Sequence, residues 1–213
     1  MIVHLVTDAR RRAGSAQPRE IYEYVVALVS QAIDAELDAV QLREPSLEAG
    51  VLATLARDLV KRAAGSRTRI IINDRLDVAI AAGAGGVHLK EQSLSPLRAR
   101  SMTPAGFHIG RSVHSVESPD ETAEADYLIA GTIWPTASKP EGHPTIGIEG
   151  LRRVVASQGC PVLAIGGVTV DRIADIARTG AAGVAAIGLF ADRSAGTMRG
   201  LAQEVRQRFD TFA

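Results

Sequence analysis

The sequence has a single cysteine, few aromatic residues and no excess of charge of either sign. One cysteine cannot form a disulfide within the chain, which is typical of proteins from reducing compartments. The 24 Lys and Arg residues equal the 24 Asp and Glu residues among 213, so no surplus of cations is available to neutralise a run of phosphates. This balance argues against nucleic acid as a partner. The charge balance does not exclude a small phosphorylated ligand.

Long hydrophobic runs are also missing. The longest aliphatic stretches have about four to seven residues, whereas a membrane-spanning helix needs about twenty. No charged segment followed by an apolar core opens the chain. We therefore expect no membrane partner and a cytoplasmic location.

What the sequence does contain is a regular alternation of two patterns. Aromatic residues make up 4% of the chain against 46% hydrophobic residues in all, so the apolar content is mainly aliphatic. Short apolar runs of this kind are typical of buried parallel strands covered by helices. They predict strands over residues 2–7, 39–44, 69–73, 86–89, 107–112, 126–131, 161–167 and 183–188.

The segments between these runs have helical spacing. Apolar residues recur at i, i+3, i+4 and i+7 over residues 21–33 and 52–60, which predicts helices with one buried face. Ser95 and Pro96 are typical of a helix N-cap and a first helical position. Shorter helices are predicted over residues 76–82, 95–101 and 172–179, and a last one over 198–209.

Eight strand and helix pairs without a linker predict one domain over residues 1–213. The expected fold is α/β, a single (β/α)8 TIM barrel with right-handed crossovers. The alternative is an open, doubly wound parallel sheet. It is disfavoured because the first strand is not followed by a Gly-x-Gly-x-x-Gly fingerprint, and because Gly-Ala-x-Gly-Val recurs at 83–87 and 180–184.

In such a barrel the active site is built at the carboxyl ends of the strands. The clearest signal there is a pair of glycine turns, one after each of the last two predicted strands. Glycines let backbone N–H groups approach an anion closely, so Gly166, Gly167, Ile187 and Gly188 are predicted to bind a phosphate. The alternative is that these glycines only turn the chain.

A second signal is the segment 132–147, which has no periodicity and contains the only tryptophan. Loops of that length inside a compact domain usually bind ligands or act as lids. Lys139 can then bring a positive charge to an anionic ligand, although a lone loop lysine is also compatible with simple solvation. Lys139 is one of several cations near strand ends, together with Arg43, Lys90 and Arg111.

The third signal is His114, which follows the fifth predicted strand. Ser112 and His114 share one side of that strand, so the imidazole is expected to face the mouth of the barrel. An imidazole titrates near neutral pH and is suited to moving protons. His4, His88 and His108 fall within strands and are expected to be interior residues.

Several phrases of the sequence, taken together and in this order, resemble the thiamine phosphate synthase/TenI superfamily. The phrases are VQLRE at 40–44, INDR at 72–75, GVHL at 86–89, GRSVH at 110–114, ADY at 125–127, PTASK at 135–139 and AIGGVT at 164–169. Two activities occur in this superfamily. Synthases join an aminopyrimidine diphosphate to a thiazole phosphate with Mg²⁺ and release pyrophosphate, and TenI-type tautomerases aromatise a thiazole carboxylate phosphate without a metal.

The resemblance implies a small phosphorylated thiazole as ligand and a homo-oligomer, with a dimer expected. It also implies a set of site residues, with His114 as the catalytic group of a tautomerase, shifting one proton. The implied substrate-binding residues are Gln41, Arg43, Asn73, Ser112, Thr136 and Lys139, and Asp74 is the metal ligand if the chain is a synthase.

The choice between the two activities depends on a few positions. Where the synthases have a diphosphate-binding lysine this chain has Pro45, and where they have a second magnesium aspartate it has Ser93. Because a diphosphate leaving group needs its charge neutralised, these losses favour the thiazole tautomerase, with no cofactor. The phrase ending in His114 favours it too. The alternatives are a Mg²⁺-dependent thiamine phosphate synthase and a regulatory thiazole-phosphate-binding protein without activity.

Overall fold

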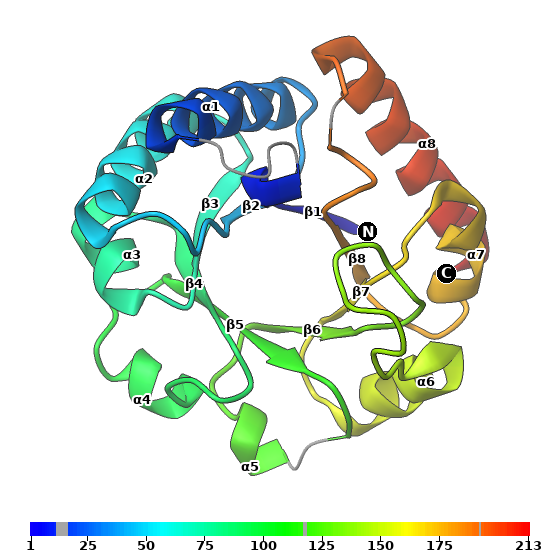
Figure 1. Cartoon of the computed structure of the whole chain (residues 1–213). Helices are drawn as coiled ribbons and strands as arrows, with labels where there is room; N and C mark the ends of the chain where they lie inside the picture. Colours follow the sequence, from blue (N-terminus) through cyan, green and yellow to red (C-terminus); the bar gives the residue numbers. More distant parts are fainter. Residues whose placement is uncertain (12–16, 117–118, 192) are drawn as a thin grey trace.

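The computed structural model describes residues 1–11, 17–116, 119–191 and 193–213. Within these ranges the chain forms a closed barrel of eight parallel strands, each paired with the next and β8 paired with β1 (Figure 1). The strands are β1 Ile2–Val6, β2 Ala39–Leu42, β3 Arg69–Asn73, β4 Gly86–Leu89, β5 His108–Val113, β6 Tyr127–Gly131, β7 Val162–Ile165 and β8 Gly183–Ala186. The predicted (β/α)8 TIM barrel is confirmed, and the open sheet is excluded.

Helices form a ring outside the strands, as Figure 1 shows. Their apolar faces pack on the barrel; α1, for example, buries Ile21, Val25 and Leu28. The helices are α1 Pro18–Asp34, α2 Ala49–Ala63, α3 Leu76–Ala82, α4 Pro96–Arg100, α5 Pro119–Thr122, α6 Gly147–Ser157, α7 Ile173–Ala177 and α8 Ala195–Phe212, with 3₁₀ turns at Ala9–Arg11 (η1) and Val170–Arg172 (η2). No helix within the described ranges has both the length and the apolar character to cross a membrane.

The start of α4 shows how local sequence sets these boundaries. The Ser95 side chain accepts a hydrogen bond from the backbone N–H of Arg98 at 3.4 Å, and Pro96 occupies the first turn. The cap satisfies one of the N–H groups that a helix start leaves unpaired. This confirms the predicted cap.

Several strand ends and two helices differ from the prediction: β2 ends at Leu42 and β8 at Ala186, each two residues before the predicted end, and α5 was not predicted. The run 161–167 was predicted as one strand, but β7 ends at Ile165 because Gly166 and Gly167 have φ values of +99° and +65°, outside the β region. The sequence analysis also named no helix between the loop at 132–147 and β7, where α6 lies. Within that loop the prediction was right, because residues 132–146 form neither helix nor strand.

The apolar core has two parts. The larger lies between the strands and the helices. The smaller fills the inside of the barrel and contains Val6, Tyr127, Ile129, Leu163 and Ala185. Side chains of this inner cluster fill the barrel, as is usual for this architecture. Space for a ligand is therefore found at the mouth of the barrel.

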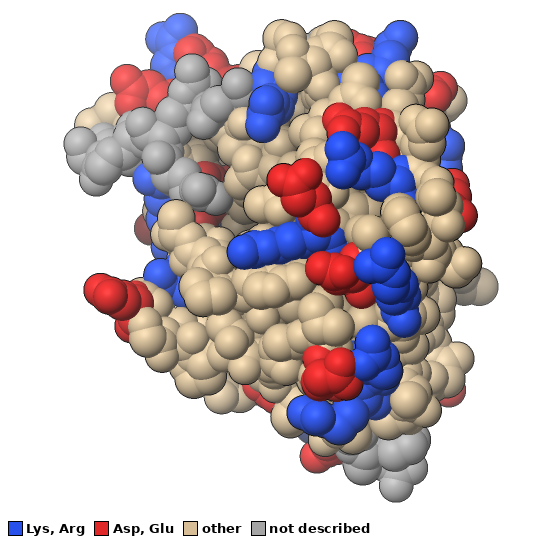
Figure 2. All heavy atoms as spheres, turned by 90° about the vertical axis from the view of Figure 1, so that its right-hand side faces the viewer, with Lys and Arg blue, Asp and Glu red and all other residues tan. Residues whose placement is uncertain are grey.

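The outer surface over α6, α7 and α8 carries both signs of charge. Figure 2, which views this side, shows Lys and Arg side chains interspersed with Asp and Glu side chains. Several of them form ion pairs along one helix, such as Arg178 with Asp175 at 3.0 Å and Arg208 with Glu204 at 3.0 Å. This face therefore presents no extended field of one sign.

Candidate active site

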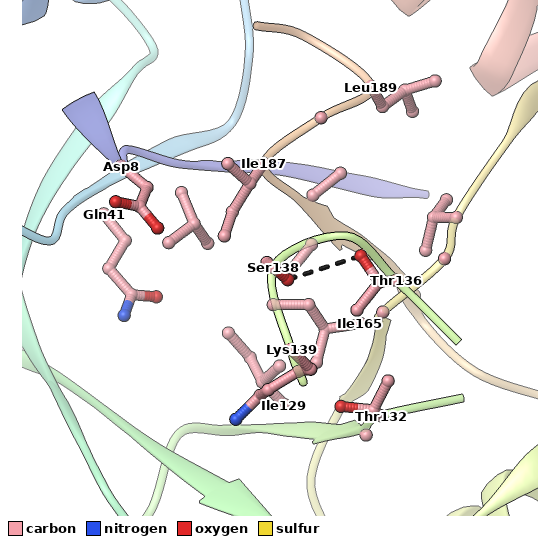
Figure 3. A pocket seen from close by; sticks show the side chains of 18 of the residues that line it. Asp8, Gln41, Ile129, Thr132, Thr136, Ser138, Lys139, Ile165, Ile187 and Leu189 are labelled. Atoms are coloured by element: carbon pink, nitrogen blue, oxygen red, sulfur yellow. Dashed lines mark hydrogen bonds between the residues drawn. The ribbon is translucent and has the colours of Figure 1, made fainter. Parts of the chain in front are cut away.

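A cavity of about 780 Å³ opens at the carboxyl ends of the strands, where the sequence analysis placed the site. Figure 3 shows side chains from opposite sides of the barrel that line it, with the loop bearing Thr136, Ser138 and Lys139 arching over it. Predicted site residues that line this cavity are Gln41, Arg43, Asn73, Ser112, His114, Thr136, Lys139, Gly166, Gly167, Ile187 and Gly188. Their roles remain predictions, but the fold brings them together.

An amide pair lies where β2 and β3 end. Gln41 Nε2 donates to Asn73 Oδ1 at 2.8 Å, and the Gln41 side chain is buried. The other amide atom, Gln41 Oε1, has no hydrogen-bond partner within the described residues. A buried carbonyl oxygen without a donor is destabilising, so this atom is suited to accept an N–H group from a ligand.

Charged groups surround the end of β1. Asp8 receives hydrogen bonds from Arg43 Nη1 at 3.2 Å and from Arg10 Nε at 2.9 Å. Burial tends to raise the pKa of Asp8, but the hydrogen bonds and charges of Arg10 and Arg43 outweigh it and hold the pKa below its usual value. Asp8 lines the cavity and fixes the Arg43 guanidinium there, a role that the sequence analysis did not assign.

Asp74 follows β3 and lies beside the cavity. Its Oδ2 atom pairs with Lys90 Nζ at 2.5 Å, and Ser93 Oγ donates to its Oδ1 atom. Burial tends to raise the pKa of Asp74, but these hydrogen bonds outweigh it and the pKa is lowered. Lys90 itself lines the cavity. The carboxylate is therefore ionised and the ammonium is held next to ligand space.

A buried chain of polar groups supports Ser112 from below. His88 Nε2 lies 2.8 Å from Ser112 Oγ, and His88 Nδ1 lies 3.3 Å from Tyr127 Oη. Burial lowers the pKa of His88 to about 3, so the ring is neutral at pH 7. Gly110 makes room for this contact, since a Cβ there would lie 2.1 Å from Tyr127 Cζ and 2.6 Å from His88 Nδ1.

His114 lies just beyond the end of β5, as predicted, and lines the rim of the cavity. Its Nδ1 atom is 2.8 Å from Glu91 Oε2, and about half of its side chain, 47%, is exposed. Glu91 therefore fixes the orientation of the imidazole. This carboxylate was not predicted, because no local sequence pattern indicates the direction of its side chain.

The opposite side of the cavity is formed by the ends of β7 and β8. Gly166 and Gly167 have positive φ values, and adding a Cβ at Gly166 would place it 2.4 Å from Thr132 Cγ2. Neither space nor backbone conformation there admits another residue without strain. With Gly188 they present backbone to the cavity, an arrangement suited to an anion.

Three comparisons with known proteins point in one direction. The family model described as thiamine monophosphate synthase matches residues 5–190. Thiamine-phosphate synthase of Methanoregula boonei is 41% identical over 152 residues, 70% of each chain, and that of Roseiflexus castenholzii is 34% identical over 188 residues, 87% of this chain and 79% of that protein. The solved structure of thiamine phosphate pyrophosphorylase from Pyrococcus furiosus has a TM-score of 0.79 at 28% identity and covers 97% of this chain and 96% of that one.

The prediction of a thiazole tautomerase, an isomerase, is therefore wrong, since curated relatives at 33% identity and above bear the name thiamine-phosphate synthase. Two structural facts explain the error. Lys90 and Arg43 line the cavity and supply positive charge there, although Pro45 replaces the diphosphate-binding lysine. The phrase that ends in His114 contains Gly110, whose identity follows from barrel packing rather than from chemistry.

Proposed function

The chain belongs to the thiamine monophosphate synthase family, and from this premise we propose that it is a thiamine-phosphate synthase. The enzyme would join an aminopyrimidine diphosphate to a thiazole phosphate and release pyrophosphate. The bond from carbon to the diphosphate oxygen breaks, pyrophosphate leaves with the electron pair, and the thiazole nitrogen uses its lone pair to form a new bond to that carbon. The observation that carries the proposal is a cavity with anion-binding groups on two opposite sides.

The side formed by β2, β3 and β4 would hold the diphosphate. Arg43 and Lys90 line the cavity there, and Lys139 reaches it from the loop after β6. Negative charge develops on the leaving oxygen as the carbon–oxygen bond breaks, and fixed cations aimed at it lower the barrier. Asp8 and Asp74 hold the two cations, which reduces the reorganisation needed during the reaction.

Mg²⁺ is the cofactor of the synthases that the sequence resembles, and it supplies charge neutralisation at the diphosphate. Within the described residues no group of three or more His, Cys, Asp or Glu lies together as a metal site. Mg²⁺ at diphosphates is commonly held by only one or two carboxylates, with phosphate oxygens and water completing its shell. Asp74 provides one ionised carboxylate, so the residues present fit a Mg²⁺ ion that enters with the diphosphate.

The side formed by β7 and β8 would hold the thiazole phosphate on the backbone N–H groups of the glycine turns. Apolar side chains of Ile129, Ile165 and Ile187 line the cavity between its two sides and offer a surface for flat rings. Gln41 would bind the pyrimidine, because its Oε1 atom has no partner within the described residues and can accept a hydrogen bond from an N–H group such as an exocyclic amine. Binding the two substrates next to each other in the cavity would remove much of the entropic barrier to their reaction.

Two variants test this assignment. Asp74→Asn should lower the rate of pyrophosphate release at least a hundredfold, because it removes the carboxylate that the family resemblance assigns to Mg²⁺. His114→Gln should change that rate less than threefold, since no proton transfer through the rim histidine is required. Asp77→Asn is the matched control, because Asp77 lies on α3 and pairs with Arg75, whereas Asp74 pairs with the cavity-lining Lys90. Full activity of Asp74→Asn would contradict the proposal.

Three further expectations stay predictions. They are the cytoplasmic location, the homo-oligomeric state, with a dimer expected, and the absence of nucleic acid among the partners. Analytical ultracentrifugation tests the second. The regulatory alternative predicts binding of thiazole phosphate without release of pyrophosphate, so the turnover assay above also tests it.

A further inference from the structure

The backbone carbonyl groups at the end of β7 accept hydrogen bonds from groups that lie outside the cavity. Three successive carbonyl oxygens accept hydrogen bonds there. Ile165 O accepts from Ile133 N at 2.9 Å, Gly166 O from Trp134 N at 3.2 Å, and Gly167 O from Arg172 Nη1 at 2.6 Å. The first two donors continue the pairing of β6 with β7. The third is a side chain.

Holding these carbonyl groups also sets the direction of the next amides. In a trans peptide the N–H bond points opposite to the preceding C=O bond. The N–H groups of Gly166, Gly167 and Val168 are thereby turned away from the β6 loop and from Arg172. All three residues line the cavity. Successive N–H groups that point into a concavity form a binding site for an anion.

Arg172 itself lies outside the cavity. It ends the η2 turn, its side chain is half-buried, and it is not among the residues that line the ligand space. Its guanidinium also stacks on the ring of Trp134, with Cζ 4.7 Å from the ring centroid. A planar guanidinium can donate in its plane and stack through its face at the same time, which an ammonium cannot do.

Space around this contact is tight. A Cβ at Gly167 would lie 2.8 Å from Pro135 O, 2.8 Å from Trp134 Cβ and 3.1 Å from Arg172 Nη1. The turn after β7 is thus enclosed by the β6 loop on one side and by Arg172 on the other. The same β6 loop carries Lys139 over the cavity.

We propose that Arg172 is a positioning residue for phosphate binding, which fixes the N–H groups of the β7 turn through Gly167 O and locks this turn to the β6 loop through Trp134. The inference rests on the proposed function in one respect, because it takes the phosphate of the thiazole substrate as the natural ligand. Arg172 itself touches no substrate.

Kinetics of three variants test the role. Arg172→Gln should raise the KM for thiazole phosphate about tenfold, because one charge-assisted hydrogen bond is lost, while kcat and the KM for the diphosphate stay within twofold. Arg172→Lys keeps a donor but not the stacking, and should restore affinity to within about threefold of the wild type. Arg178→Gln is the control, since Arg178 stacks on Phe212 at 4.6 Å, away from the cavity, and should behave as wild type.

Direct binding separates this inference from the proposed function. Calorimetric titration with inorganic phosphate and with thiazole phosphate should give a dissociation constant about tenfold higher for Arg172→Gln, and the emission of the only tryptophan, Trp134, should shift in that variant without ligand. If pyrophosphate is never released but this affinity loss is found, the positioning role stands and the synthase assignment fails. If turnover is normal and Arg172→Gln binds both phosphates as tightly as wild type, the positioning role is refuted, even where the emission shifts. Should Arg172→Gln not fold, Trp134→Leu carries the test because it removes the stacking partner of Arg172, and wild-type affinity of that variant for both phosphates refutes the positioning role.

Discussion

Two imidazoles lie inside the barrel, and each is next to the ring of Tyr127. The ring centroids of His4 and His88 are 5.7 and 5.6 Å from that of Tyr127, and the two histidines are only 1% and 2% exposed. Burial lowers the pKa of His4 to about 4 and that of His88 to about 3. Both rings are therefore neutral in the folded protein at any pH above 5.

This burial makes stability depend on pH in a defined direction. In the unfolded chain a histidine has a pKa of about 6.5, so the unfolded state binds protons that the folded state excludes. The contribution of the two buried rings to the free energy of unfolding is fully present above this pKa and is lost as the pH falls below it. Between pH 7 and pH 5 each ring costs about 2 kcal/mol of the free energy of unfolding, or about 4 kcal/mol together, which is large against a typical total of about 5–15 kcal/mol.

Urea unfolding at the two pH values measures the effect. His4→Leu removes one of the two titrating rings and should lose only about 2 kcal/mol over the same interval. His4 Nε2 has no hydrogen-bond partner within the described residues, so the substitution breaks no hydrogen bond at this atom. Burial raises the pKa of Glu44, which acts in the opposite direction, but this contribution is common to both proteins and cancels in the difference.

His143→Gln is the control for the loss of a histidine outside the barrel, because His143 lies in the loop after β6, and it should keep the wild-type pH dependence. An equal loss of stability in wild type and His4→Leu would refute the reasoning. It would mean that water or a charged partner reaches the barrel interior.

Three further predictions concern the cavity. Gly167→Ala should weaken thiazole phosphate binding at least tenfold in calorimetry, because the left-handed backbone at φ +65° costs about 1–2 kcal/mol for other residues and the added Cβ would lie 2.8 Å from Pro135 O; unchanged affinity would contradict the contact. Ser93→Asp should lower the Mg²⁺ concentration for half-maximal activity severalfold, because it adds a second carboxylate next to Asp74, and an unaltered Mg²⁺ titration would remove Asp74 from the metal site. Lys139→Met should raise the KM for the diphosphate, and the difference from wild type should shrink at high salt; a salt-independent effect would argue against a charge contact.

Much of the fold follows from patterns in the sequence. The helix over residues 21–33 was found because its apolar face is regular, and the cap at Ser95 because its chemistry is local. The end of β7 was placed two residues too far, since the turn at Gly166 follows an apolar run without a break. The helix Gly147–Ser157 was missed although its apolar residues lie on one face, because it is short, begins at a glycine and directly follows the aperiodic loop.

The site was predictable in position but not in its contacts. The rule that barrels bind at the carboxyl ends of strands led to Gln41, Asn73 and the glycine turns, all of which line the cavity. The partners Glu91 and Arg172 were not found, because their contacts join separate loops whose side-chain directions no periodicity reveals.

The choice of activity failed for a related physical reason. Two lost charges, at Pro45 and Ser93, were counted by sequence position. Diphosphate binding depends on which charged groups lie near the cavity in the folded chain. There Lys90 and Asp74, which come from different loops, form an ion pair. A count along the sequence could not place that pair in space.

One assay separates the two activities: both substrate sets are offered to the purified protein, with Mg²⁺ and again with a chelator. The synthase assignment predicts that the aminopyrimidine diphosphate and the thiazole phosphate are consumed together with Mg²⁺, that thiamine phosphate and pyrophosphate appear in equal amounts, and that the chelator stops the reaction. It would be contradicted if no pyrophosphate were released while the thiazole carboxylate phosphate was aromatised at the same rate with and without the chelator.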